Sequence, residues 1–169
     1  MRILEKRWTS IMKKLSLILS SILISFFTTQ SFTEEKFING QATVIDGDTI
    51  KIQGISIRLS GIDAPEMKQL CFKNDLAFNC GLSAKMHLEK LIKKDKGKAN
   101  CKFENLDKYG RILGDCAGLN VAMVADGWAV AYTRYSDEYL PWQKIAKKQK
   151  LGLWSTKFDY PEEWRRKYK

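Results

Sequence analysis

The sequence predicts an α+β domain in which helices are inserted into and appended to a small five-stranded mixed barrel. Three short apolar segments separated by turn residues come first, at 41–45, 49–53 and 55–60, and a further strand pair and several helical segments follow. The chain has 169 residues, of which 44% are hydrophobic. This amount of apolar material supports one core and excludes a second large domain.

The first three predicted strands are expected to form an antiparallel meander. The Asp-Gly-Asp turn at 46–48 separates the first strand from the second, and Gly54 separates the second from the third. In the third strand the apolar residues from Ile55 to Leu59 alternate with polar ones. Because successive side chains of a strand point to opposite faces, Arg58 lies on the face away from the core.

The later elements are predicted from helical spacing and from turn residues. Ser83 is a candidate N-cap for a helix that ends near Asp95. A second hairpin joins strands at 98–104 and 111–116. The last predicted elements are a helix at 119–125, an extended segment at 128–132 and a basic amphipathic helix at 137–150.

Residues 1–31 have the pattern of an export signal. Five basic residues within the first 14 positions precede an uncharged apolar run from Leu15 to Phe27. As a helix, this run covers roughly 20 Å, which is less than the roughly 30 Å hydrocarbon core of a bilayer. Translation from Met12 would give a more ordinary signal. We expect export and cleavage near residue 31, with an uncleaved membrane-anchored form as the alternative.

Four cysteines lie in the predicted mature chain. Export would bring them into an oxidising compartment, where two disulfides are the default expectation. Cys71 with Cys80 would close a short loop, and Cys101 with Cys116 would join the two strands of the second hairpin. No Cys-x-x-Cys pair occurs in the sequence, which argues against a zinc site.

The charge of the chain favours a polyanionic partner. The formal net charge is +10 at pH 7, which attracts nucleic acids or anionic membranes. The single histidine, His87, lies in a predicted helix. This argues against hydrolases that depend on a histidine pair or on a Ser-His-Asp or Cys-His centre.

Carboxylates and an arginine gather around the first meander. Asp46 and Asp48 lie in its first turn, and Asp63 and Glu66 follow its last strand. Turn aspartates commonly cap only their own backbone, but these carboxylates with a main-chain carbonyl are also suited to a hard cation such as Ca²⁺. Arg58 near such a cation would bind phosphate oxygens through two parallel N–H groups; the structural alternative is a salt bridge to an aspartate.

A second arginine lies in the turn of the second hairpin, at 107–111. Carboxylates, a cation and two arginines meet the needs of phosphodiester hydrolysis, which are an activated water, a base and positive charge opposite the phosphate. A turn rich in Asp and Gly also exists without any function. The two clusters together favour the catalytic interpretation.

These segments resemble the staphylococcal nuclease, or thermonuclease, family of calcium-dependent nucleases. The resemblance covers residues 41–156, and its matching segments are 45–49, 58–59, 63–66, 107–111, 131–132 and 151–155. It implies an OB-fold with a five-stranded antiparallel barrel and about three helices, in a single nuclease domain over residues 32–169. It also implies an endonuclease acting on DNA and RNA. The four cysteines and the C-terminal segment at 161–166 resemble those of an exported bacterial subgroup of the family.

The resemblance implies roles for individual residues. The implied metal site consists of Asp48, Asp63 and the backbone carbonyl of Ala64, with Asp46 near the Ca²⁺ through water. The implied catalytic residues are Arg58 and Arg111, which contact the phosphate, and Glu66, which acts as base or orients the attacking water. The implied nucleotide-binding residues are Lys108, Tyr109 and Tyr132.

Two positions depart from the family pattern. Ala64 replaces the hydroxyl residue that is common there, which is tolerable if only its carbonyl binds the metal. In the segment 133–135, either Arg134 or Tyr135 is a candidate for the next nucleotide contact, and the sequence leaves this open.

Two other function classes compete with the nuclease. One is a catalytically inactive OB-fold module that binds nucleic acid, which the presence of Arg58, Glu66 and Arg111 together argues against. The other is a membrane-tethered interaction domain whose basic helix at 137–150 binds anionic lipid. A monomer is the default expectation for the oligomeric state, and no obligate protein partner is evident.

Overall fold

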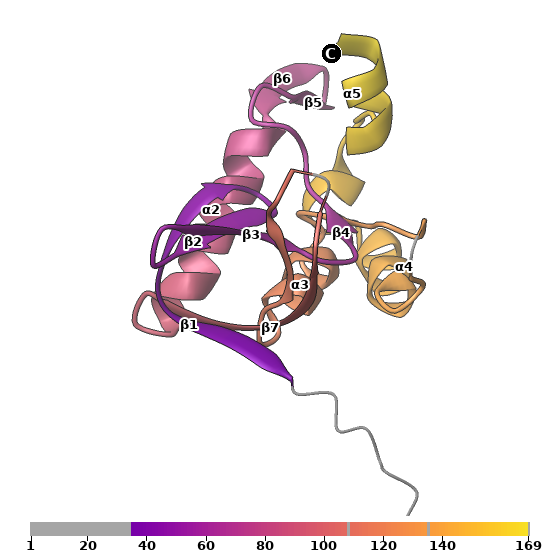
Figure 1. Cartoon of the computed structure of the whole chain (residues 1–169). Coiled ribbons are helices and arrows are strands. Elements are labelled where there is room, and N and C mark those ends of the chain that lie inside the picture. The colour runs from indigo at the N-terminus through magenta and orange to yellow at the C-terminus, as the bar shows by residue number, and fades with distance from the viewer. Residues whose placement is uncertain (1–34, 108, 135, 169) are drawn as a thin grey trace, which may run out of the picture. The chain divides into compact units, whose positions relative to one another are not determined.

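A closed barrel of five strands is the centre of the structure, a computed structural model that describes residues 35–107, 109–134 and 136–168 (Figure 1). The signal predicted for residues 1–31 lies outside these residues. The strands follow one another around the barrel in the order β1 (Lys36–Asp46), β2 (Thr49–Ile52), β3 (Ile55–Leu59), β8 (Ile112–Asp115) and β7 (Lys98–Leu106). The predicted α+β class with a five-stranded barrel is confirmed.

One strand pair differs from the predicted antiparallel barrel. β3 and β8 run parallel, with Ile57 opposite Ile112, whereas the other four barrel pairs are antiparallel. In the chain, α2 (Cys80–Lys94) and β7 lie between these two strands. Because no tight turn joins β3 to β8, a parallel pairing is open to them.

The hydrophobic core fills the barrel and continues beneath two helices. Ile50, Ile52, Ile57 and Leu59 have no exposed surface. α2 and α3 (Leu119–Ala125) bury their apolar residues in the same cluster. Each fully buried side chain of this size contributes roughly 1.5–3 kcal/mol, so the barrel is a rigid support for the loops at its ends.

The start of α2 corrects the predicted N-cap. The side chain of Asn79, not of Ser83, caps the helix by accepting a hydrogen bond from the N–H of Leu82 at 2.8 Å. The Ser83 hydroxyl instead donates to the carbonyl of Asn79 at 3.0 Å. Both residue types are good caps, and the choice falls on Asn79 because the helix already begins at Cys80.

The helices after α3 also differ from prediction. α4 (Leu140–Gln149) begins at Leu140 rather than at residue 137, because Pro141 belongs to the first turn, the place in a helix where proline is favourable. The 3-10 helix η1 (Gly152–Ser155) and α5 (Pro161–Tyr168) follow, so the described residues hold four α-helices rather than about three. None of the described helices has the length and hydrophobicity needed to cross a membrane.

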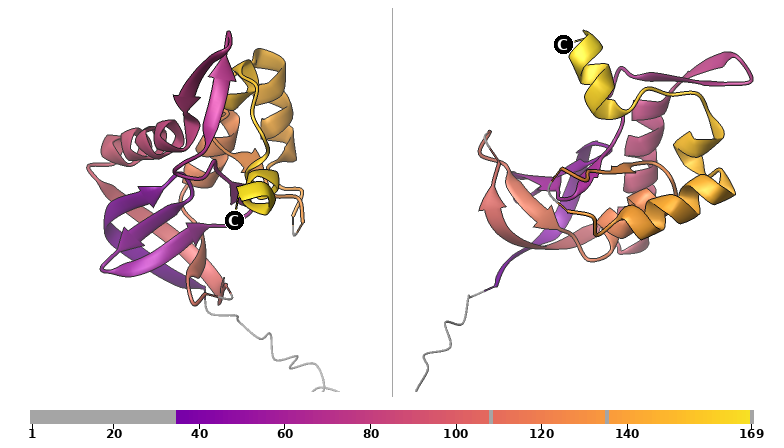
Figure 2. Two further views of the ribbon diagram at one scale, coloured as in Figure 1. Left: turned by 90° about the horizontal axis from the view of Figure 1, so that it is seen from above. Right: turned by 90° about the vertical axis from the view of Figure 1, so that its right-hand side faces the viewer.

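A hairpin that the sequence analysis did not predict joins the barrel to α2. It consists of β5 (Leu70–Lys73) and β6 (Leu76–Asn79) and lies at the same end of the domain as α5 (Figure 2). Its two loop residues, Asn74 and Asp75, have φ values of 50° and 61°. A two-residue hairpin loop needs this left-handed conformation, which Asn and Asp tolerate better than most residues.

Both predicted disulfides are present. Cys71–Cys80 joins β5 to the first residue of α2. Cys101–Cys116 joins β7 to the residue that follows β8. The described part of the chain contains no free cysteine.

Reduction of these disulfides is expected to destabilise the protein. The linked cysteines are 9 and 15 residues apart. Each disulfide that closes a loop of this length stabilises the folded state by about 3 kcal/mol, because it restricts the unfolded chain. Urea unfolding with and without reductant measures the difference in the free energy of unfolding. Alkylation of native protein followed by mass mapping should find no free thiol, and two or more would contradict the pairing.

Candidate active site

A groove of about 1060 Å³ is lined by the ends of the barrel strands, by their loops and by α5. Asp63 forms ion pairs with two residues that line this groove, Arg58 and Arg165. Lys108 lies outside the described residues. The other predicted site residues all line the groove: Asp46, Asp48, Arg58, Ala64, Glu66, Tyr109, Arg111 and Tyr132.

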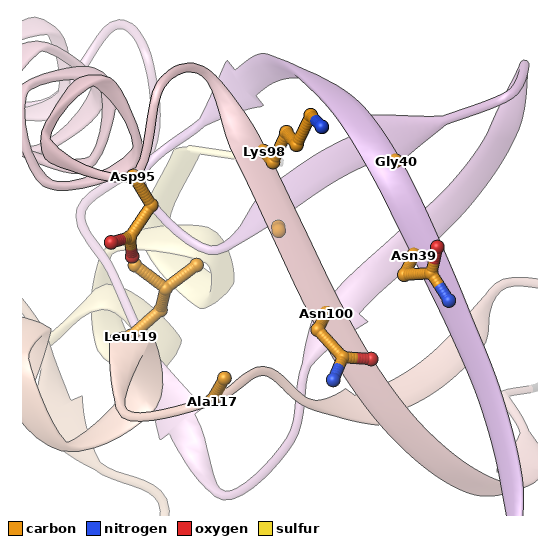
Figure 3. A pocket seen from close by; sticks show the side chains of 8 residues that line it. Asn39, Gly40, Asp95, Lys98, Asn100, Ala117 and Leu119 are labelled. Carbon is orange, nitrogen blue, oxygen red and sulfur yellow. The ribbon is translucent and has the colours of Figure 1, made fainter.

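A smaller pocket of about 330 Å³ lies elsewhere on the barrel (Figure 3). Its lining includes Asn39 of β1, Asn100 of β7, Asp95 at the end of α2 and Leu119 at the start of α3. It shares no lining residue with the larger groove. The predicted chemistry therefore belongs to the larger groove.

Asp48 is positioned by the turn before β2. Thr49 pairs with Arg58 across β2 and β3, and Asp48 is thereby placed beside the Arg58 guanidinium. Only 4% of Asp48 is exposed, and its carboxylate accepts a hydrogen bond from the N–H of Ala64 at 2.9 Å. Burial raises the pKa of Asp48 to about 7, although Arg58 lowers it, because a buried carboxylate loses the hydration of its charge.

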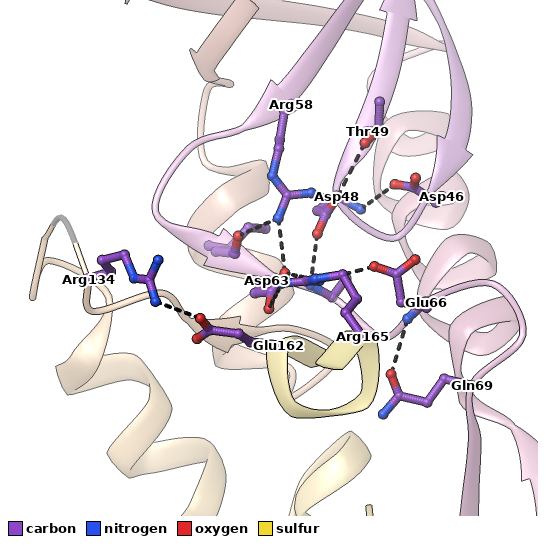
Figure 4. A network of polar contacts seen from close by, with 12 residues as sticks. Asp46, Asp48, Thr49, Arg58, Asp63, Glu66, Gln69, Arg134, Glu162 and Arg165 are labelled. Carbon is purple, nitrogen blue, oxygen red and sulfur yellow. Dashed lines mark hydrogen bonds and ion pairs between the residues drawn. The ribbon is translucent and has the colours of Figure 1, made fainter. Parts of the chain in front are cut away.

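Arg58 joins the two acidic segments (Figure 4). Its guanidinium donates hydrogen bonds to Asp48 and, over 3.0 Å, to Oδ1 of Asp63. Asp63 lies in β4 (Ile62–Asp63), which pairs with β9 (Val130–Ala131). The salt bridges considered as the structural alternative for Arg58 are therefore present, and 21% of its side chain remains exposed.

Glu66 lies in a loop that is fixed by Gln69 and by α2. The fully buried Gln69 accepts the N–H of Glu66 with its side chain at 3.2 Å and donates its own backbone N–H to the Glu66 carbonyl at 2.7 Å. A Cβ atom at Gly81 would lie 1.9 Å from that carbonyl oxygen, so only glycine lets α2 approach the loop this closely. A quarter of the Glu66 side chain is exposed.

The second arginine is held by Asp107, whose role the sequence did not reveal. One carboxylate oxygen of Asp107 accepts the backbone N–H groups of Tyr109 and Arg111, both at 2.9 Å, and the other accepts Nε of Arg111 at 2.7 Å. Burial alone would raise the pKa of Asp107, but these hydrogen bonds lower it overall. The Arg111 guanidinium lies 5.6 Å from the centre of the Tyr109 ring.

Tyr132 lies where β9 meets the loop before α4. Its backbone N–H donates to the carbonyl of Gly61 at 2.9 Å. The guanidinium of Arg134 lies 6.0 Å from the centre of the Tyr132 ring and forms an ion pair with Glu162 of α5 at 2.8 Å. Tyr135 lies outside the described residues, so the choice between Arg134 and Tyr135 stays open.

α5 contributes Arg165, which the sequence analysis did not assign to the site. Its Nη1 and Nη2 atoms lie 2.9 Å from Oδ1 and Oδ2 of Asp63, and Nη1 lies 3.0 Å from Oε1 of Glu66 (Figure 4). These partners are 102 and 99 residues away in the chain. The sequence analysis singled out the segment at 161–166 only for its likeness to an exported subgroup of the family, and this did not identify Arg165.

The oxygen donors of the groove have the chemistry that Ca²⁺ requires. The Asp48 carboxylate contacts the main chain of Ala64, Asp46 accepts the N–H of Asp48, and Arg58 joins Asp48 to Asp63. Ca²⁺ prefers six to eight oxygen ligands that include waters, and these carboxylates can supply some of them. Burial raises the pKa of Asp48 and so disfavours its charged form, which a bound cation would stabilise. The residues therefore fit the ion, although the described residues hold no preformed cluster of three or more His, Cys, Asp or Glu side chains.

Comparison with protein families identifies a match over more than half of the chain. A family described as "Staphylococcal nuclease homologue" matches residues 56–156. The matched range begins in β3 and contains Arg58, Asp63, Glu66 and Arg111. Asp46 and Asp48 lie just before it, and α5 follows it.

Several known proteins are similar to the chain over most of its length. A micrococcal nuclease of Shigella flexneri is 33% identical over 145 residues, which cover 73% of this chain and 77% of that protein. An uncharacterized endonuclease of Haemophilus influenzae is 31% identical over 165 residues, covering 90% and 86%. The succinoglycan biosynthesis protein ExoI of Rhizobium meliloti is 32% identical over 145 residues, covering 80% and 74%.

Proposed function

Because the chain belongs to the staphylococcal nuclease family and is an endonuclease, we propose that it is an exported, Ca²⁺-dependent enzyme that cleaves DNA and RNA in the larger groove. The observation that carries this proposal is the convergence of Asp48, Asp63 and Glu66 on arginine side chains within one groove. Two disulfides are compatible with export. The mature enzyme would be residues 32–169, acting as a monomer.

The groove residues divide the chemistry among them. Asp48, Asp63 and the carbonyl of Ala64 would hold Ca²⁺, with Asp46 contacting it through water, and the bound ion would supply positive charge next to the scissile phosphate. The Glu66 carboxylate would take a proton from the attacking water or orient it. Arg58 and Arg111 would stabilise the charge that develops on the phosphate oxygens.

The aromatic side chains of the groove suit substrates without a fixed base sequence. Tyr109 is 73% exposed on the 107–111 turn, and Tyr132 lines the same groove. Such rings stack on any base, and contacts to phosphate carry no sequence information. Tyr109, Tyr132 and Lys108 would therefore bind nucleotides with little base preference.

Cleavage assays with and without calcium test this proposal. Supercoiled plasmid and single-stranded RNA are incubated with the purified protein in Ca²⁺ or in excess chelator. We expect both substrates to be cleaved in Ca²⁺ and to stay intact with chelator. Retained binding without cleavage in Ca²⁺ would instead favour the inactive nucleic-acid-binding module, and cleavage that survives the chelator would exclude a metal role.

Substitution of Asp63 is expected to weaken calcium binding. Asp63→Asn keeps the shape of the side chain but removes the charge of a proposed ligand. The calcium affinity should fall at least tenfold, because loss of a residue that only hydrogen-bonds to a metal ligand commonly costs this much. Asp48→Asn should have the same effect. Asp95→Asn, in the smaller pocket, is the control for loss of one negative charge. Calcium titration by calorimetry measures the affinities, and unchanged values for both groove variants would place the ion elsewhere.

A further inference from the structure

The guanidinium of Arg165 occupies both oxygens of Asp63. Two parallel N–H groups face the two carboxylate oxygens at 2.9 Å each, and one of them also reaches Glu66 at 3.0 Å. Oδ1 of Asp63 accepts a further bond from Arg58 at 3.0 Å. Since 1% of the Asp63 side chain is exposed, a cation that takes either oxygen has to displace an arginine N–H group.

Of the two arginines, Arg165 is the one that can leave. Arg58 lies within barrel strand β3 and also holds Asp48, so its position is fixed by the core. Arg165 lies on α5, a helix of eight residues near the C-terminus. Two other residues of α5 also form ion pairs, Glu162 with Arg134 and Lys167 with Asp159, and all four side chains are partly exposed. Exposed ion pairs contribute little to stability, so these two contacts do not hold α5 in place, and of the helix only its first residue, Pro161, is buried.

We propose that Arg165 is a displaceable counter-ion of the active centre, which competes with the divalent cation for Asp63 and keeps Glu66 paired until that cation binds. This inference rests on the proposed function, because it takes Asp63 as a metal ligand and Glu66 as the water-activating group. Without the cation, Arg165 neutralises the two carboxylates. When the cation is bound, both it and the Arg165 guanidinium place positive charge next to the two carboxylates. Repulsion between the cation and the guanidinium then favours release of α5.

Arg166 provides a matched control for this proposal. It is the next residue of α5, it lines the same groove and it is exposed. Arg166→Gln therefore removes the same charge from the same helix. Arg165→Lys is a further variant, which keeps the charge but cannot offer two parallel N–H groups to one carboxylate.

The test is calcium titration of the full protein by calorimetry, without nucleic acid, for wild type, Arg165→Gln, Arg165→Lys and Arg166→Gln. Couplings of this kind commonly change affinity 5- to 150-fold, so we expect Arg165→Gln to bind Ca²⁺ about tenfold more tightly than wild type. The calcium affinity of Arg165→Lys should lie between those of wild type and Arg165→Gln, and the affinity of Arg166→Gln should equal that of wild type. In chelator, Arg165→Gln should melt at a lower temperature than Arg166→Gln, and Ca²⁺ should reverse this order.

Two results would overturn the proposal. Equal calcium affinity of Arg165→Gln and Arg166→Gln would show that the guanidinium does not compete with the ion. Weaker binding by Arg165→Gln would make Arg165 a residue that positions the carboxylates for the metal. In both cases calcium binding and DNA cleavage by the wild type would leave the proposed function standing. If no variant binds Ca²⁺, the calcium dependence and this inference fail together.

Discussion

Replacing Glu66 with Gln is expected to lower the turnover number by about a thousandfold. The amide keeps the size of the side chain and an oxygen that can accept the Arg165 N–H, but it cannot take a proton from water. General base catalysis typically contributes a factor of 10² to 10⁴. A quarter of the Glu66 side chain is exposed in the groove, and Glu66 shares Arg165 with the proposed metal ligand Asp63. Substrate affinity should stay near the wild-type value.

Glu162→Gln is the matched control for this substitution. Glu162 lines the same groove and carries the same charge, but its ion pair is with Arg134 and it has no role in the proposed chemistry. Single-turnover cleavage of a labelled oligonucleotide in Ca²⁺ measures both variants. If Glu66→Gln cleaves within a few-fold of Glu162→Gln, the proton acceptor is a different group.

Replacing Arg111 with Lys is expected to lower turnover by about a hundredfold. Loss of one preorganised donor to developing charge commonly has this cost. Lysine keeps the charge that drives association with nucleic acid, so affinity should fall much less. Arg58→Lys should lower turnover by a similar factor, but it also breaks the bridge between Asp48 and Asp63 and should reduce the melting temperature.

The partner of Arg111 separates catalysis from structure. Asp107→Asn removes the ion pair with Arg111 but keeps an oxygen for the two backbone N–H groups that shape the turn. If Arg111 served only as the partner of Asp107, then Arg111→Lys and Asp107→Asn would lower the melting temperature alike and leave turnover nearly normal. Parallel measurement of turnover, affinity and melting temperature on these variants distinguishes the two roles.

The features that could be predicted from the sequence depend on residues that lie close together in the chain. Asp48 and Arg58 belong to one meander, whose antiparallel register brings them together without information from the rest of the chain. The disulfides followed equally from local reasoning, because each joins cysteines that are close in sequence. The five-stranded barrel was predicted from the same local turns and alternation.

The contributions that were missed depend on contacts between distant parts of the chain. Arg165 meets Asp63 across 102 residues, and no periodicity in an eight-residue helix indicates such a partner. The β5–β6 hairpin is different, because the Asn74-Asp75 pair did carry a turn signal in the sequence. The cap of α2 offered two suitable residue types, Asn79 and Ser83, and propensity alone does not decide between them.

The most direct test of the active centre is a crystal structure of the Glu66→Gln variant with Ca²⁺ and a short oligonucleotide, since the slowed variant should retain uncut substrate. We expect an anomalous calcium peak at the carboxylates of Asp48 and Asp63 and a phosphate within hydrogen-bond distance of Arg58. A calcium peak or a bound phosphate elsewhere on the protein, with the Asp48 and Asp63 carboxylates still paired with arginine, would contradict the assignment of this groove as the site of cleavage.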